Sequence, residues 1–320
     1  MKLKLWVRLV VAILLFVILF QFVPWRQAVK LLASASVGFC LVAMALSILG
    51  MFLSAQRWRV LLRAHELQVS VLDAVRVYWI GAFFNNFLPS NVGGDAVRAA
   101  ITKPSGKLAQ VAASIVVERI TGAVVLLLLA IVALILRPSY FRVAGLLPII
   151  WVSIAFMSAA LIGAVLFGEQ LAARLTATQD SGQATLTARF LGKARKLIDA
   201  VNHYKRAPTV VYWALVLALP FYASVIIFQY SLISAVGANL PLAEVLLVAP
   251  LIPLVSMIPV SLNALGVAEG AFVLFYTQAG LSPAQALAAA LLRRVVLLLI
   301  SVIGGVFWIT SKKEADAESA

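Results

Sequence analysis

The sequence predicts an all-α polytopic membrane protein with about six full spans and two re-entrant helical hairpins, arranged as inverted repeats. Three observations support this class. First, 63% of the 320 residues are apolar or aromatic and only 12% are charged, whereas a soluble domain has roughly 45–50% apolar and roughly 25% charged residues. Second, several apolar stretches reach the roughly 20 residues that a helix needs to cross a bilayer. Third, two more apolar stretches are interrupted by Pro, Asn and Gly, a pattern typical of transporters built from inverted repeats.

The composition also argues against several classes of protein. Two His and one Cys, Cys40, are too few for a disulfide framework, a multi-cysteine zinc site or a CxxC redox motif. The sequence contains no HExxH, GxSxG, GxxxxGK[ST] or EF-hand pattern, so familiar hydrolase, ATPase and calcium-binding functions lack support. Lys and Arg number 26 against 12 Asp and Glu, which in a membrane protein indicates cationic loops beside anionic lipid. We therefore expect no cofactor, no metal, no catalytic activity and no nucleic-acid partner.

Six stretches are predicted as full spans. The first, about Leu5–Val23, has Lys2, Lys4 and Arg8 at its N-terminal end and lacks a small-residue cleavage site, so we expect a retained anchor and not a signal peptide. The interrupted stretches, about Val71–Leu88 and Ala243–Tyr276, are predicted to dip into the membrane and return on the side from which they entered. The other five spans are about Val29–Ala55, Val111–Leu136, Leu147–Phe167, Thr209–Val236 and Leu287–Ile309.

Basic residues predict the orientation. They gather before the first span, after the second at 57–63, in the hydrophilic stretch 169–208 and after the last span at 312–313. By the positive-inside rule, these segments and both termini are expected in the cytoplasm, as in a multi-pass protein of the cell inner membrane. Apolar residues from Leu186 to Tyr204 recur at helical spacing opposite basic ones, which predicts a helix that either lies on anionic headgroups or is an ordinary solvated loop helix.

The two interrupted stretches resemble each other and predict an internal repeat. Asp73 lies 16 residues before Pro89, and Glu244 lies 15 before Pro259. Each half then reads as two spans, a hairpin and a third span, and the charge analysis orients the halves oppositely. The predicted units are 1–137, with a cytoplasmic-side hairpin over 71–107, and 138–310, with an outer-side hairpin over 243–280; 311–320 is predicted to be a disordered tail.

The first hairpin carries an unusual polar passage around Pro89. Unsatisfied polar groups facing lipid cost several kcal/mol each, so this passage predicts an unwound segment lining a watery cavity. A helix beginning at the two glycines would offer bare N–H groups to an anion such as phosphate. The alternative is a turn whose amides satisfy its own backbone. The candidate substrate-binding residues here are Asn86, Ser90, Asn91, Gly93, Gly94, Asp95 and Arg98.

Charged residues at membrane depth complete the candidate site. Glu118 and Arg119 are adjacent on a predicted helix and cannot face each other, so we expect them to pair with Asp95 or Arg98. Two arginines lie deep in the last span and need an acid or an anionic ligand. Substrate contact and purely structural pairing are both compatible with these residues. The candidates in the second half are Asn263, Gly266, Glu269, Arg293 and Arg294.

The passage from Asn86 to Arg98 resembles the signature of the lysylphosphatidylglycerol synthase transmembrane region, or flippase-like, family. Glu118-Arg119 and the stretch from Pro259 to Glu269 resemble that family's later motifs, and the resemblance covers roughly residues 5–310. In bifunctional members this region precedes a soluble synthase domain, which we do not expect here. The resemblance implies a stand-alone member, a branch often associated with glycosyltransferases or lipid-modifying enzymes. The family usually has Gly-x-Gly before the second acid, where this chain has Ala264-Leu265-Gly266.

The sequence thus predicts a flippase-like protein that moves an anionic phospholipid or a polyprenyl-phosphate-linked lipid between leaflets. One alternative is a non-transporting membrane partner of a glycosyltransferase or lipid-modifying enzyme. Another is a membrane-embedded transferase acting on a lipid-linked substrate. A homo-oligomer is compatible with the sequence.

Overall fold

A computed structural model describes residues 23–87, 93–102, 107–136, 186–256 and 262–318, with residue 21. Every regular element in these ranges is a helix, which confirms the predicted all-α class. The predicted span Leu147–Phe167 and nearly all of Leu5–Val23 lie outside the described residues. The α-helices are α2 (Trp25–Ala33), α3 (Val37–Leu62), α4 (Val71–Phe87), α5 (Gly93–Ile101), α6 (Leu108–Leu136), α8 (Leu186–His203), α9 (Pro208–Ala235), α10 (Leu242–Val248), α11 (Leu251–Ser256), α12 (Val267–Gln278) and α13 (Pro283–Glu318). Short 3-10 helices are η1 (Arg63–His65), η3 (Tyr204–Arg206) and η4 (Leu262–Ala264).

Four helices of the described part of the chain are long and apolar enough to cross a membrane: α3, α6, α9 and α13. The last three match the predicted spans closely. The second predicted span, Val29–Ala55, was wrong at its start, because α2 ends at Ala33 and α3 begins only at Val37. The break falls at Ser34-Ala35-Ser36, where the Ser36 N–H donates to the Ala235 carbonyl of α9 at 2.8 Å instead of continuing a helix.

The last helix is longer than predicted. α13 runs from Pro283 to Glu318 and so includes most of the segment 311–320 that we expected to be a disordered tail. That segment reads Ser-Lys-Lys-Glu-Ala-Asp-Ala-Glu-Ser-Ala, and Lys, Glu and Ala all have high helix propensity. Local propensity therefore extends the span beyond its apolar part.

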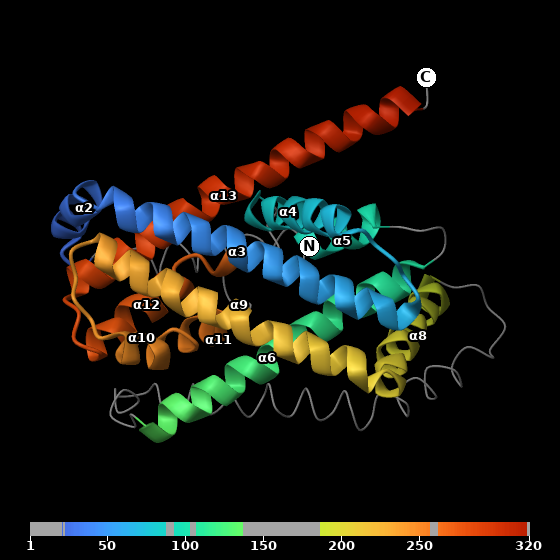
Figure 1. Ribbon diagram of the computed structural model, residues 1–320, viewed down its shortest axis with the longest axis horizontal. Coiled ribbons are helices and arrows are strands. Elements are labelled where there is room, and N and C mark those ends of the chain that lie inside the picture. The colour runs from blue at the N-terminus through green and yellow to red at the C-terminus, as the bar shows by residue number, and fades with distance from the viewer. Residues whose placement is uncertain are drawn as a thin grey trace.

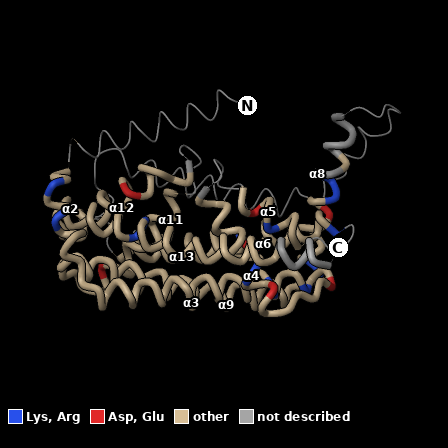
Figure 2. The backbone as a smooth tube through the Cα atoms, turned by 90° about the horizontal axis from the view of Figure 1, so that it is seen from above, with Lys and Arg blue, Asp and Glu red and all other residues tan. Residues whose placement is uncertain are grey.

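The antiparallel pair α3 and α9 forms one side of the molecule along its length (Figure 1). Their shared face contains small residues, which allow close approach of helices in a membrane protein. Gly50 is an example, because a methyl group there would lie 3.2 Å from the Ser224 hydroxyl. Figure 2 shows that most of the length of both helices carries no charge, as expected of segments surrounded by hydrocarbon.

Two helical hairpins fill the space behind this pair. α5 folds back on α4, and both lie near the C-terminal end of α3, where Leu62, Ala74 and Ala99 share one buried cluster. α12 folds back on α11 near the C-terminal end of α9, where Val236, Val245 and Tyr276 share another. Because α3 and α9 are antiparallel, the hairpins extend inward from opposite ends of the molecule (Figure 1).

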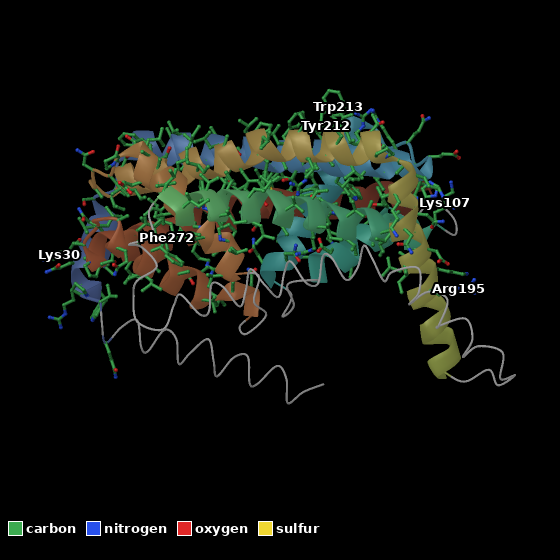
Figure 3. All side chains as sticks on the ribbon, turned by 90° about the horizontal axis from the view of Figure 1, so that it is seen from below. Lys30, Lys107, Arg195, Tyr212, Trp213 and Phe272 are labelled. Carbon is green, nitrogen blue, oxygen red and sulfur yellow. The ribbon has the colours of Figure 1, made fainter. Side chains whose placement is uncertain are left out.

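Helix α8 lies at the same end as the first hairpin and packs on α6, where Ala200 shares a buried cluster with Ala113 and Val117. It confirms the predicted helix from Leu186, and Tyr204 anchors its base by donating to the Leu61 carbonyl of α3 at 2.9 Å. Figure 3 shows Lys107 and Arg195 at this end of the molecule and Lys30 at the other. Tyr212 and Trp213 project outward from α9, with ring centroids 5.7 Å apart, as in the aromatic belt of a membrane interface.

Candidate functional site

The first hairpin is held together by a close approach between α4 and α5. The Gly94 N–H donates to the side-chain oxygen of Asn85 at 2.9 Å. A methyl group at Gly94 would collide with the Gly81 carbonyl and with Asn85, so only glycine fits. The expectation that Gly94 offers a free N–H to an anion was therefore wrong, because the amide is satisfied within the hairpin by the side chain of Asn85 and not by the backbone of the turn.

Two ion pairs join this hairpin to α6. Arg98 of α5 pairs with Glu118, and Arg119 donates from Nε to Asp95 at 2.7 Å and also from Nη2. The prediction that Glu118 and Arg119 pair with Asp95 and Arg98 is confirmed. The adjacent residues point to different partners because neighbours on a helix are about 100° apart. Asp95, Arg98 and Glu118 are buried, while about half of the Arg119 side chain is exposed.

Aromatic rings surround the Arg98 guanidinium. Its central carbon lies 4.6 Å from the ring centroid of Trp58 and 4.6 Å from that of Tyr78, so cation–π attraction adds to the ion pair. The Tyr78 hydroxyl also donates to Glu118 at 2.9 Å. Arg98 therefore holds α3, α4 and α6 together through one buried cation.

Arg57 is a member of this cluster that the sequence analysis assigned only to the cytoplasmic flank of α3. It is 5% exposed, and its Nη2 lies 3.4 Å from a Glu118 oxygen. Its Nε and Nη1 have no hydrogen-bond partner among the described residues. The signal that separates Arg57 from the exposed Arg63 is its position nearly two turns closer to the middle of the span, where it faces the small residue Gly122.

The second hairpin is built around a left-handed turn. Asn263, Ala264 and Gly266 have φ of 44°, 53° and 78°, conformations that suit Gly and Asn far better than Ala. The turn delivers the chain into α12, whose first N–H groups are partly satisfied by a carboxylate: the Gly266 N–H donates to Glu269 at 2.8 Å. Gly266 thus lies directly before α12 as its N-cap, whereas Gly93 is the first residue of α5.

Glu269 forms the second charge cluster with α13. Its Oε1 accepts from Arg294 Nε at 2.8 Å and Nη2 at 2.6 Å, while Oε2 is occupied by Gly266. Glu269 is 1% exposed. Arg293 interacts with Glu269 only at longer range and makes no hydrogen bond or ion pair among the described residues. The prediction that Glu269 pairs with the two arginines is confirmed for Arg294 alone.

The tips of the two hairpins meet. Nδ2 of Asn263 donates to the side-chain oxygen of Asn86 at 3.0 Å, although the two residues are 177 positions apart. Arg294 also lies 3.4 Å from the Asn263 carbonyl. This contact brings the two charge clusters into one continuous region. Ser90 and Asn91 of the predicted site lie outside the described residues.

Two adjoining cavities lie beside the clusters. A polar chamber of about 200 Å³ is lined by Asn85, Tyr78 and the ion-paired side chains of α5 and α6. A larger cavity of about 400 Å³ lies between α3, α6, α9, α11 and α13 and is lined mainly by apolar side chains. We call these the polar chamber and the apolar cavity.

Three residues line both cavities: Arg57, Glu118 and Arg119. The apolar cavity also includes Arg293. A polar chamber beside an apolar cavity suits an amphiphile, which has a charged headgroup and an apolar chain.

Comparisons with known proteins agree with this architecture. The chain is 21% identical over 332 residues to a UPF0104 membrane protein of Pyrococcus horikoshii, with 97% of this chain and 98% of the relative covered. It is 24% identical over 288 residues to a UPF0104 membrane protein of Methanothermobacter thermautotrophicus, with 83% of each covered. No solved structure matches the chain significantly. The family model described as the lysylphosphatidylglycerol synthase TM region matches residues 5–305, so this membrane protein belongs to the lysylphosphatidylglycerol synthase transmembrane-region family.

Proposed function

We propose that the protein moves an anionic lipid between the two leaflets of a cell membrane. The observation that carries the proposal is the contact between two hairpins from opposite ends of the molecule, Asn86 to Asn263, beside buried charges and a cavity. Broken helices that meet at the middle of a membrane are a recurrent substrate-binding arrangement in transporters. Inverted repeats, predicted from the sequence, would let each hairpin open toward its own leaflet.

The chemistry of the cavities supports a lipid as cargo. The apolar cavity is lined by side chains such as Leu46, Leu126 and Phe228, which suit a hydrocarbon chain. The polar chamber beside it contains arginines, which bind phosphate oxygens through paired N–H donors. In this proposal the ion pairs Asp95–Arg119 and Glu269–Arg294 open in turn as the headgroup passes.

The proposed orientation puts the end that carries α8 in the cytoplasm. Arg59, Arg63, Lys107 and the basic face of α8 lie at that end, while Lys30 and Arg26 of α2 lie at the other. The positive-inside rule favours the more basic end as cytoplasmic. A cell inner membrane with both termini inside is part of the same proposal.

Transport is tested in liposomes that contain the purified protein and fluorescent anionic phospholipids or polyprenyl phosphates. We expect Asp95→Ala and Arg294→Ala each to slow lipid movement by about tenfold or more, since each removes one buried charge pair. Arg26→Ala is the matched control, because Arg26 is exposed and packs only over Trp25. Equal lipid movement by the wild type and both site variants would overturn the proposal.

A second candidate is a docking role for a glycosyltransferase or lipid-modifying enzyme. Helix α8 favours it, because α8 carries a basic face and packs on the long helices only through its C-terminal part within the described residues, from Leu197 to Tyr204. Loss of function in cells after deletion of residues 186–206, with lipid movement intact in liposomes, would support this role over transport.

A further inference from the structure

We infer that the substrate headgroup is a dianionic phosphate monoester on an apolar chain, and not a singly charged phosphodiester. This inference rests on the proposed function and narrows its substrate class. It is drawn from the balance of charge around the two cavities, which the ion pairs among the described residues leave incomplete.

The charges of the two clusters do not cancel. Among the described residues, five arginines take part in the clusters and three carboxylates face them, which leaves an excess of two positive charges. All three carboxylates and two of the arginines, Arg57 and Arg98, are buried, and the other three arginines are partly exposed. The arginines are Arg57, Arg98, Arg119, Arg293 and Arg294; the carboxylates are Asp95, Glu118 and Glu269. Uncompensated charge in a low-dielectric site is costly unless a partner neutralises it.

The two predicted spans outside the described residues offer no acid that would complete the balance. Residues 1–65 and 119–168 contain no Asp or Glu at all. These ranges include both spans, Leu5–Val23 and Leu147–Phe167. An anionic ligand would supply the missing negative charge.

The surplus is concentrated at the apolar cavity. Its charged lining residues are Arg57, Glu118, Arg119 and Arg293, again an excess of two positive charges. Arg57 has two unpartnered nitrogens among the described residues, and Glu269 already has both oxygens occupied by Arg294 and Gly266, so Arg293 has N–H donors to spare. A phosphate at this position would receive hydrogen bonds from two arginines while its chain occupied the apolar part of the cavity.

Charge distinguishes the two classes of lipid phosphate. A monoester has a second pKa of about 6 and carries nearly two negative charges at neutral pH. A phosphodiester carries one negative charge. Only the monoester carries enough negative charge to neutralise the excess of two positive charges. Its second negative charge adds a Coulomb attraction that the diester lacks, and such attraction is stronger in a protein cavity than in water.

The test uses the full-length protein in detergent and three matched probes: dodecyl phosphate, its methyl diester and inorganic phosphate. Native mass spectrometry gives the affinities. We expect dodecyl phosphate to bind about tenfold or more tightly than the other two at neutral pH. The preference over the diester should fall as the pH drops below about 6, where the monoester gains a proton.

Variants test whether the preference for the phosphate monoester depends on the arginines of the apolar cavity. Arg293→Gln should remove most of the monoester preference, Arg293→Lys should retain it, and Arg195→Gln on the surface of α8 should leave it unchanged. Equal affinity for monoester and diester would overturn the inference while leaving the liposome test of transport untouched. Inorganic phosphate bound as tightly as dodecyl phosphate would overturn it too, because the site would then recognise free phosphate and not a lipid.

Discussion

Glu118 receives interactions from three helices: Arg57 of α3 at 3.4 Å, the Tyr78 hydroxyl of α4 at 2.9 Å, and Arg98 of α5. Removing such a carboxylate leaves buried cations without compensation, and that loss exceeds the value of any single contact. At the scale of single residues, one carboxylate therefore links two arginines and a tyrosine at the centre of the molecule.

We expect Glu118→Gln to destabilise the protein by about 3 kcal/mol or more, because two buried arginines lose their only shared negative charge. The thermal midpoint of the protein in detergent, followed by fluorescence-detected gel filtration, measures the change. Glu66→Gln, at an exposed position, is the control and should leave the midpoint in place. A Glu118→Gln midpoint equal to that of the control would show that the cluster does not stabilise the fold.

Replacing Ala264 with glycine should make the protein more stable. Its φ of 53° places Cβ close to backbone atoms, a cost that glycine avoids. We expect Ala264→Gly to stabilise the protein by about 1 kcal/mol, measured as a higher thermal midpoint. The same substitution at Ala271, inside α12, should instead lower the midpoint, since glycine weakens a helix interior. A lower midpoint for both variants would contradict the left-handed turn.

At the scale of elements, the two hairpins depend on different local devices. The first uses the close approach of Gly94 to Gly81 and the cap from Asn85. The second uses a left-handed turn and the cap from Glu269. In both, a polar side chain satisfies the helix N-terminus, which a buried or lipid-facing helix end requires.

Gly94→Ala should disrupt the first hairpin, because the added methyl group collides with the Gly81 carbonyl and Asn85. We expect a loss of about 2 kcal/mol or more, as for other overpacked positions, seen as a lower thermal midpoint. Gly270→Ala is the matched control: its added methyl group has no atom within 4 Å and lies inside a helix, where Ala is preferred. If the two variants had equal midpoints, the close packing of α4 on α5 would be disproved.

The base of α8 depends on Tyr204. Tyr204→Phe should cost about 1 kcal/mol through loss of the hydrogen bond to Leu61, measured as faster proteolysis at the junction of α8 with α9. Burial raises the pKa of Tyr204, which keeps the hydroxyl protonated, so the cost should be constant between about pH 6 and pH 9, below the ordinary tyrosine pKa. A variant as protease-resistant as the wild type would mean that this bond does not anchor α8.

At the scale of the whole molecule, the hydrogen bond between Asn86 and Asn263 links the tips of the two hairpins within the described residues, and with them the two halves of the chain. If lipid movement requires the hairpins to separate in alternation, a covalent link between their tips should stop it. The single native thiol, Cys40, is readily removed for such an experiment.

In a Cys40→Ala background, we expect Asn86→Cys with Asn263→Cys to react with a short bis(methanethiosulfonate) cross-linker, which attaches to each thiol through a reducible disulfide, because the two side chains are 3.0 Å apart in the wild type. Lipid movement in liposomes should then stop and return when the link is reduced. Each single cysteine variant, treated in the same way, controls for modification alone. If the linked protein still moves lipid, transport does not require the tips of the hairpins to move apart.

The sequence by itself determined the class of the protein, the boundaries of the spans α6 and α9, the position of both hairpins and the family. Apolar runs, Pro and Gly interruptions and rare charges at membrane depth are local signals, because the bilayer makes every polar residue costly wherever it occurs. It also identified the pairing of Glu118 and Arg119 with α5, since few other charges lie deep enough to be partners.

Only the tertiary structure decided how those residues meet. The sequence missed Arg57, Tyr78 and Asn85, because an arginine near a span end and polar residues in a broken helix have no spacing that reveals a partner in another helix. The sequence also left open whether the amide of Gly94 was free. The packing of α4 on α5 brings the side-chain oxygen of Asn85 to this amide as its hydrogen-bond acceptor. The contact between hairpin tips 177 residues apart, and the cavities beside it, arise from helix packing over long sequence separations, which no local pattern encodes.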